Sequence, residues 1–318
     1  MSELAVAAEA APAETPNTAR RVRLGRTDLE VTRIGIGCGN GINNADLQYA
    51  ISRGVNYIFT SSDMHAAAYR RSWGGIRRTV RRGSARRDDI VLVGCSYVND
   101  AEKLPGIVAD HMMSWGADYL DVFQWGWMTR INQPVPLLDA TDRIMRNEAT
   151  RKNLDSFFRT VREVGAELRS RGYARYIGVS THDRALAAEI AGHEQLDVLM
   201  YRYNIAHRGA ENDIAPALAA LPRRPGTVVF NTQHVSGAPL ASAPPGLPAG
   251  KHVPDEAELY RFALDRNDVD VVLSGPAKRE HVDAALDALD RPPLEPRKQD
   301  YLRKLGDLRN GRVRVATA

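Results

Sequence analysis

Cysteine, lysine and long apolar runs are scarce in this chain of 318 residues. The two cysteines, Cys38 and Cys95, are too few and too far apart for a disulfide framework or a thiolate zinc cluster, so we expect two reduced thiols. No apolar stretch reaches the roughly 18 residues that a membrane-spanning helix needs, and the amino terminus lacks the features of a secretory signal. These absences predict a soluble cytoplasmic protein with no membrane partner.

Arginine dominates the basic residues, since only six lysines occur and the formal net charge is +4. Binding to nucleic acid needs a concentrated basic face rather than a small global excess. The densest basic run has helical spacing and comprises Arg77, Arg78, Arg81, Arg82, Arg86 and Arg87. We interpret it as the solvated outer face of a helix and predict no nucleic-acid partner.

The chain is predicted to form one domain behind a short tail. Residues 1–20 are rich in Ala, Glu, Pro and Thr without periodicity, which is typical of a disordered segment. In residues 21–318, β-branched runs near 33–38, 55–59, 90–94, 120–125, 175–179, 198–202, 227–231 and 269–274 read as strands. Helical patterns fall at 45–52, 66–82, 101–115, 155–171, 184–191, 211–220, 255–265 and 279–289. Eight such units predict a single (β/α)8 barrel.

Barrels of this kind carry their active sites at the carboxyl ends of the strands. The connection after the fourth predicted strand, residues 126–152, is unusually long, and we expect it to contact substrate. A second long connection, residues 232–254, is rich in Ala, Pro and Gly.

Several short motifs resemble bacterial aldo/keto reductases, in the correct order over residues 21–289. They are residues 24–37, 87–92, 116–124 and 176–180, Tyr203-Asn204, and residues 271–276 followed by Glu280-His281-Val282. Each motif alone is weak, but together they are specific for that superfamily. The resemblance implies a (β/α)8 barrel with a short amino-terminal hairpin.

The same resemblance implies a missing catalyst. That family reduces carbonyls with NADPH and uses an Asp, a Tyr, a Lys and a His, which here fall on Phe59, Met64, Cys95 and Gly126. The Tyr is the proton donor, and the Lys with its Asp lowers the pKa of that Tyr. A shift of one residue brings Asp63 or Tyr69 nearer the site without restoring the Lys and the His.

The family's cofactor contacts are also depleted. Ser180-Thr181 and Met200 stand where the resemblance expects a Ser-Asn pair and a Gln for the nicotinamide amide, and Asn231 and Thr232 where it expects a stacking aromatic. Ala277 and Ala285 replace an Arg and an Asn at the adenine end. Lys278 and Arg279 could still meet a phosphate at that helix start. A cofactor-free enzyme is therefore favoured, with NADPH binding left open.

The predicted strand ends nevertheless bear groups suited to proton transfer: His65, Asp63, Tyr97, His182 and His234. Imidazole titrates near neutral pH, so each histidine is either an acid/base group or a residue of a loop or helix start. Three histidines with Asp63 could in principle ligate a metal, but no spacing supports that geometry and we predict no metal.

Substrate contacts are predicted from Trp125, Trp127, Tyr201, Arg202, Tyr203 and Cys95. Arg202 could hold a carboxylate or phosphate, or form a structural ion pair. Cys95 is either a nucleophile with a lowered pKa or an apolar plug, and the tryptophans either wall the site or pack outside the barrel.

Three functions remain in view for a small-molecule substrate. The favoured one is a redox-neutral lyase, isomerase, dehydratase or cyclase that acts on a small polar metabolite through acid/base chemistry. The second is an NADPH-dependent reductase with an unusual proton donor such as His65 or Tyr97. The third is an inert ligand-binding or subunit-binding barrel, because fold does not dictate function.

Overall fold

A computed structural model describes residues 21–64, 66–84, 86–98, 100–128, 154–235 and 237–311, without the side chains of Trp127 and of residues 154–157. The predicted disordered tail, His65 and most of the long connection at 126–152 lie outside these residues. Within the described helices, none combines the length and the apolar character needed to cross a membrane.

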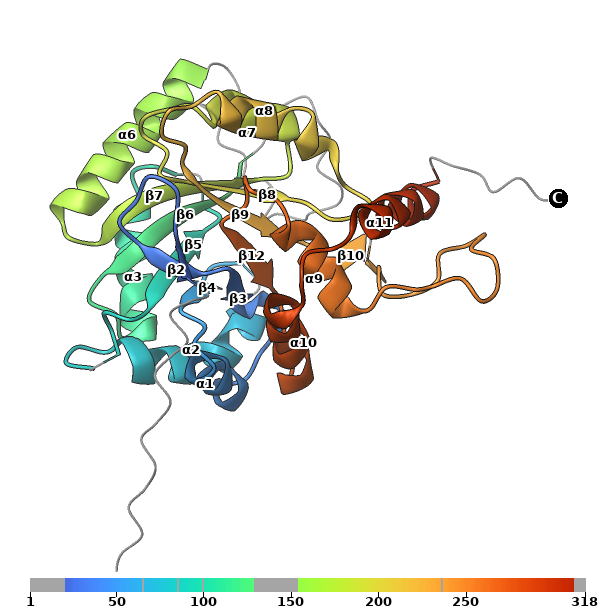
Figure 1. Ribbon diagram of the computed structural model, residues 1–318. Helices are drawn as coiled ribbons and strands as arrows, with labels where there is room; N and C mark the ends of the chain where they lie inside the picture. Colours follow the sequence, from blue (N-terminus) through green and yellow to red (C-terminus); the bar gives the residue numbers. More distant parts are fainter. Residues whose placement is uncertain are drawn as a thin grey trace, which may run out of the picture.

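Eight parallel strands close into a barrel, which confirms the predicted fold class (Figure 1). Around the barrel, each strand pairs with the next in chain order, and the last pairs with the first. The strands are β3 (Ile34–Gly37), β4 (Tyr57–Ser61), β5 (Val91–Ser96), β6 (Leu120–Met128), β7 (Ala174–Thr181), β8 (Val198–Arg202), β9 (Gly226–Phe230) and β12 (Val271–Ser274). All eight coincide with predicted runs to within a few residues.

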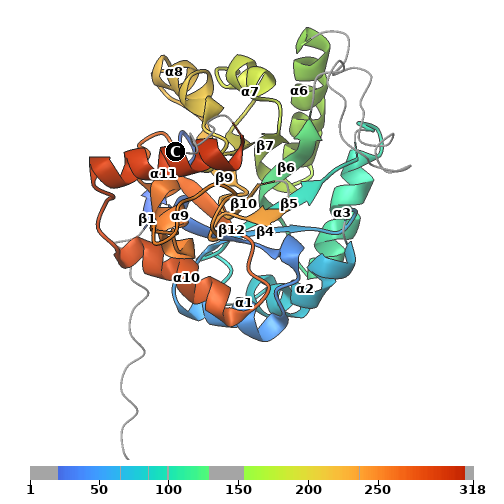
Figure 2. The ribbon, with the colours of Figure 1, turned by 90° about the vertical axis from the view of Figure 1, so that its right-hand side faces the viewer.

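Helices follow the strands and surround them (Figure 2). They are α1 (Asn44–Ser52), α2 (Ala66–Val80), α3 (Leu104–Trp115), α6 (Leu154–Ser170), α7 (Arg184–Ile190), α8 (Ile214–Ala219), α9 (Glu256–Leu264) and α10 (Arg279–Asp290). Side-chain oxygens fix several starts: Asn43 accepts from two amides of α1, and Asp255 forms a capping box with Glu258.

Further elements complete the chain. The hairpin β1 (Arg21–Arg23) and β2 (Glu30–Thr32) precedes the barrel, and a short ribbon, β10 (His234–Val235) with β11 (Ala238–Pro239), follows β9. Two single 3₁₀ turns are η2 (Cys38–Asn40) and η3 (Gly209–Glu211). A last helix, α11 (Pro296–Arg309), was not predicted. It packs against the segment after β8, where Arg208 bonds both carboxylate oxygens of Asp307 at 2.9 Å.

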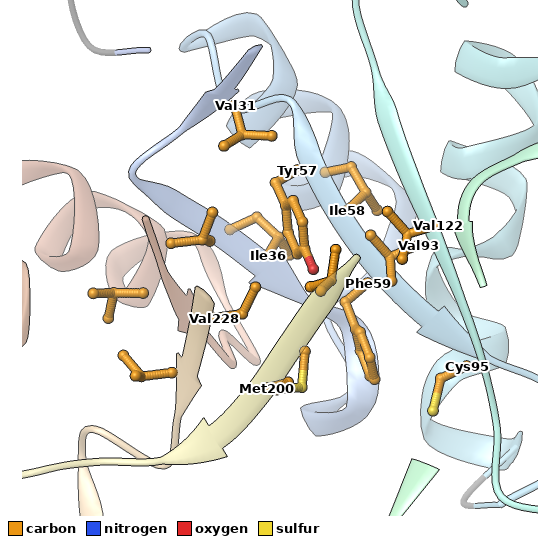
Figure 3. Packing of buried hydrophobic residues seen from close by; sticks show 14 of the residues in the cluster. Val31, Ile36, Tyr57, Ile58, Phe59, Val93, Cys95, Val122, Met200 and Val228 are labelled. Atoms are coloured by element: carbon orange, nitrogen blue, oxygen red, sulfur yellow. The ribbon is translucent and has the colours of Figure 1, made fainter. Parts of the chain in front are cut away.

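The barrel interior is filled by apolar side chains, so it is a packed core rather than a channel (Figure 3). Phe59, Val93 and Val122 are register partners on β4, β5 and β6, and Met200 and Val228 are register partners on β8 and β9. Because paired residues of parallel strands share a face and residues alternate along a strand, these positions identify the inward-facing side chains near each strand end.

Candidate active site

The inward face of the barrel continues to its open end, the mouth, which is formed by the carboxyl ends of the strands. Ser61, Cys95, Gln124 and Gly178 are consecutive register partners on β4 to β7. They lie two residues beyond the core layer that holds Phe59, Val93 and Val122. The floor of the mouth is therefore buried and uncharged, with Ser61 and Gln124 as its polar residues, and residues after the strands supply the charged groups.

Asp63 follows β4 and ties the carboxyl ends of β4 and β5 together. One carboxylate oxygen accepts from Ser61 Oγ at 2.9 Å and from the Met64 amide at 2.7 Å. The other accepts from Ser96 Oγ at 2.6 Å and from the Tyr97 amide at 3.1 Å. These four bonds occupy the usual acceptor directions of a carboxylate. Asp63 thus lies at the predicted site, where it holds Ser96 and Tyr97 in place rather than offering a free base.

His111 lies behind Asp63 and was not predicted. Its Nε2 atom is 3.8 Å from Oδ2 of Asp63, and its side chain is 3% exposed. Burial lowers the pKa of His111, and the nearby Asp63 charge opposes that shift. The sequence gives no sign of its role, because His111 lies in the middle of a helix at a position with core spacing. It precedes Trp115 by four residues, and the two ring centroids are 5.2 Å apart.

Tyr97 and Tyr69 form the centre of this half of the mouth. The Tyr97 hydroxyl is hydrogen-bonded to the Tyr69 hydroxyl and the Cys95 thiol. Burial raises the pKa of all three groups, and the nearby Cys95 raises those of the two tyrosines further. At neutral pH, both phenols are proton-bearing donors, and the Cys95 thiol stays protonated. The structure therefore favours Cys95 as a packing residue over Cys95 as a nucleophile.

The other half of the mouth is aromatic and cationic. Arg202 and Phe230 end β8 and β9 as register partners. His182 follows β7, and its ring meets that of Phe230 edge-on, with centroids 5.0 Å apart. His182 as a residue is exposed, but partial desolvation of its imidazole and positive charge on Arg202 and His207 lower its pKa to about 4. Its imidazole is neutral at physiological pH.

Phe230 was missed by sequence reasoning, which considered only Asn231 and Thr232 at this strand end. It is the last residue of β9, half-buried, and it faces the same side as Arg202. It stands one position before Asn231, where the aldo/keto reductase resemblance expects an aromatic residue.

Other predicted substrate residues are not brought into the mouth. Tyr201 alternates with inward-facing Met200 and lies buried in the helix layer. Tyr203 is also buried, stacks on Phe262 at 5.8 Å and donates to Glu211 at 2.6 Å. Trp125 is buried and donates its indole N–H to the Val98 carbonyl at 3.0 Å. These contacts make all three residues part of the barrel's packing.

The remaining predicted residues lie at the periphery or outside the described part. His234 is exposed on β10. Lys278 lies 3.7 Å from Glu280, and Arg279 lies 3.4 Å from Asp46 on α1, so both predicted phosphate contacts already have acidic neighbours. His65 and the Trp127 side chain are not among the described residues. In the described ranges, no three His, Cys, Asp or Glu side chains gather as metal ligands would.

The strand order defines a (β/α)8 barrel, and polar groups gather at its open end. Neither protein-family models nor curated protein sequences give a match to this chain. Solved structures do. An aldo-keto reductase from Bacillus halodurans in its holo form aligns with a TM-score of 0.66 and 19% identity, over 90% of this chain and 96% of that chain.

Its apo form gives a TM-score of 0.63 and 20% identity, over 90% of this chain and 95% of that chain. A thermostable aldo-keto reductase solved with the inhibitor epalrestat gives 0.61 and 18% identity, over 90% and 99% of the two chains. The chain therefore has the fold of the aldo-keto reductases, as its motifs predicted.

Proposed function

We propose that this barrel catalyses redox-neutral acid/base chemistry on a small polar metabolite, as an isomerase, dehydratase, lyase or cyclase. The observation that carries the proposal is the pair of neutral phenols at the mouth. The groups that act most strongly on the Tyr97 hydroxyl are Cys95 and Tyr69, and neither is a cation. Burial and these neighbours keep the Tyr97 phenol protonated, so it donates a hydrogen bond to a substrate oxygen instead of carrying charge.

The two halves of the mouth supply complementary roles. Tyr97, held through its backbone amide by Asp63, donates to a carbonyl oxygen of the substrate and stabilises the negative charge that develops there. Across the mouth, the neutral His182 imidazole accepts a proton from carbon and returns it at another position. His111 and Asp63 act through Tyr97, so they are positioning residues.

A nicotinamide cofactor fits these residues poorly. Met200 is an apolar side chain where the resemblance expects an amide, and the Thr181 hydroxyl already donates to the Met128 carbonyl at 2.6 Å. The predicted phosphate contacts Lys278 and Arg279 lie beside acidic residues. These features support chemistry without hydride transfer.

One observation favours a second function, an NADPH-dependent reductase with Tyr97 as the proton donor. Phe230 presents an aromatic face at the strand end where the resemblance expects a ring to stack on the nicotinamide. Titration with NADPH, followed by nicotinamide fluorescence, separates the two functions. Redox-neutral chemistry predicts no saturable change, whereas tight binding with turnover of any carbonyl would establish the reductase.

Proton exchange tests the favoured function without knowledge of the final product. Small carbonyl metabolites in deuterated water are followed by NMR for loss of the protons next to the carbonyl. We expect Tyr97→Phe to slow exchange about 10²-fold or more, as for loss of a positioned donor. Tyr49→Phe is the matched control, because the Tyr49 hydroxyl bonds Asp283 on the exterior. Equal exchange in Tyr97→Phe and wild type would refute the assigned role.

A further inference from the structure

Arg202 is a half-buried cation at the inner wall of the mouth. It ends β8 two residues after Met200, and strand alternation places both side chains on the inward face. Its register partner on β9 is Phe230, whose ring lies edge-on to His182. Arg202 therefore lies beside Phe230 on the neighbouring strand, and its charge acts on the His182 imidazole.

Among the described residues, Arg202 pairs with no acidic side chain, in contrast to the arginines around it. Arg208 is paired bidentately with Asp307, Arg266 lies 2.8 Å from Asp268, and Arg303 bonds Glu211. For Arg202, no ion pair or hydrogen bond to an acidic side chain occurs within the described ranges. The structural ion pair expected as the alternative role of Arg202 is therefore not seen among the described residues.

The surroundings of Arg202 add positive charge. Arg184 at the start of α7 acts on Arg202 as a like charge, although Arg184 lies 3.4 Å from Asp213. Burial together with this repulsion lowers the pKa of Arg202. A partly desolvated cation without a partner is unfavourable, and an oxyanion placed against its planar fork relieves the cost through paired charge-assisted hydrogen bonds.

We propose that Arg202 binds an oxyanion group of the substrate, a carboxylate or a phosphate, while the adjoining part of the substrate packs against Phe230. The inference rests on the proposed function and narrows its substrate class to small anionic metabolites. Arg202 anchors the anionic end, which leaves the reactive carbonyl to Tyr97 and the proton transfer to His182.

Calorimetric titration of the full chain with inorganic phosphate, and separately with oxalate, tests the anchor and distinguishes the two oxyanion sources. Ionic strength is held constant with sodium chloride so that general screening does not change. We expect saturable binding of at least one anion and a tenfold to hundredfold weaker affinity in Arg202→Met, roughly the effect of losing a charge-assisted bidentate contact. Arg202→Lys should retain part of the affinity.

Arg297→Met is the matched control, since Arg297 is exposed on α11 and its loss makes the same change in net charge. Binding of both anions by Arg202→Met as tightly as by Arg297→Met overturns the proposal, and so does the absence of binding of either anion to the wild type. Urea unfolding supplies a second readout. If Arg202 is an anion anchor, Arg202→Met should be at least as stable as wild type in buffer without phosphate or oxalate, whereas clear destabilisation would show a structural role instead.

The experiments distinguish failure of the proposed anion contact at Arg202 from failure of the proposed acid/base function. Anion binding that persists in Tyr97→Phe while wild-type proton exchange is absent rejects only the acid/base function. Proton exchange that depends on Tyr97 but not on Arg202 rejects only the anchor.

Discussion

The ring of Tyr97 occupies the space that a side chain on Gly126 would need. A Cβ atom added to Gly126 would lie 2.5 Å from Cδ1 of Tyr97 and 2.9 Å from Sγ of Cys95. The aldo/keto reductase resemblance expects a histidine at this position. The position of the Tyr97 ring and the absence of a side chain at residue 126 are therefore linked, because β6 can carry only glycine at that position while Tyr97 keeps its place.

Gly126→Ala should destabilise the barrel through this contact. Overpacking of a tight site costs about 1–3 kcal/mol of unfolding free energy. In the Tyr97→Ala background the obstructing ring is gone, so the added methyl group should cost much less. Urea unfolding of the four proteins gives the coupling between the two positions. Additive effects would show that Tyr97 does not restrict Gly126.

His182 should make stability depend on pH on the acid side. Its folded-state pKa of about 4 lies below its usual value of 6.5. As the pH falls from about 6.5 to 4, the unfolded chain therefore takes up the proton first, and the unfolding free energy decreases. His182→Gln should flatten that part of the profile. His111 has a pKa shifted in the same direction, so some slope will remain. An NMR titration of the His182 ring with a midpoint near 6.5 would contradict the assignment.

Neither cysteine should react with a thiol reagent in the native protein. Cys38 and Cys95 are buried, and burial raises the pKa of Cys38 to about 12 and that of Cys95 well above its usual range. At pH 8, Ellman's reagent should therefore modify the two thiols only at the rate of unfolding, and both should react at once in guanidinium chloride. Rapid modification of one thiol in native buffer would show an accessible thiolate and revive Cys95 as a nucleophile.

The barrel was predictable because its strands are short β-branched runs separated by amphipathic helices. What failed locally has a physical cause. Helix α11 is rich in charged residues and has few apolar ones, so its sequence shows no clear apolar face. Its docking depends on ion pairs such as Arg208 with Asp307, whose members lie far apart in the chain. Strands β10 and β11 are only two residues long each, which is too short for an alternation of polar and apolar residues to be recognised in the sequence.

The place of a residue at the barrel mouth was predictable where it closely follows a strand, as for Asp63, Tyr97 and His182. Position alone could not distinguish inward from outward side chains, which is why Tyr201 and Tyr203 were placed with Arg202. The strand register separates them, since Met200 faces the core and Tyr201 the helix layer. His111 required the three-dimensional packing of α3 against the loop after β4, which no local pattern encodes.

The basic run at 77–87 contains one residue that should behave unlike the others. Arg77, Arg78, Arg81, Arg82 and Arg86 are exposed as predicted, but Arg87 is buried and lies 2.9 Å from Asp121. Asp121 also accepts from the Leu92 amide at 2.9 Å. Arg87→Met would leave Asp121 buried with Arg175, 3.1 Å away, as its remaining cation, and should cost about 1.5–3 kcal/mol of unfolding free energy. Arg86→Met, its exposed neighbour, should stay within about 0.5 kcal/mol. Equal midpoints for the two variants in urea would mean that the buried pair does not secure β5 to β6.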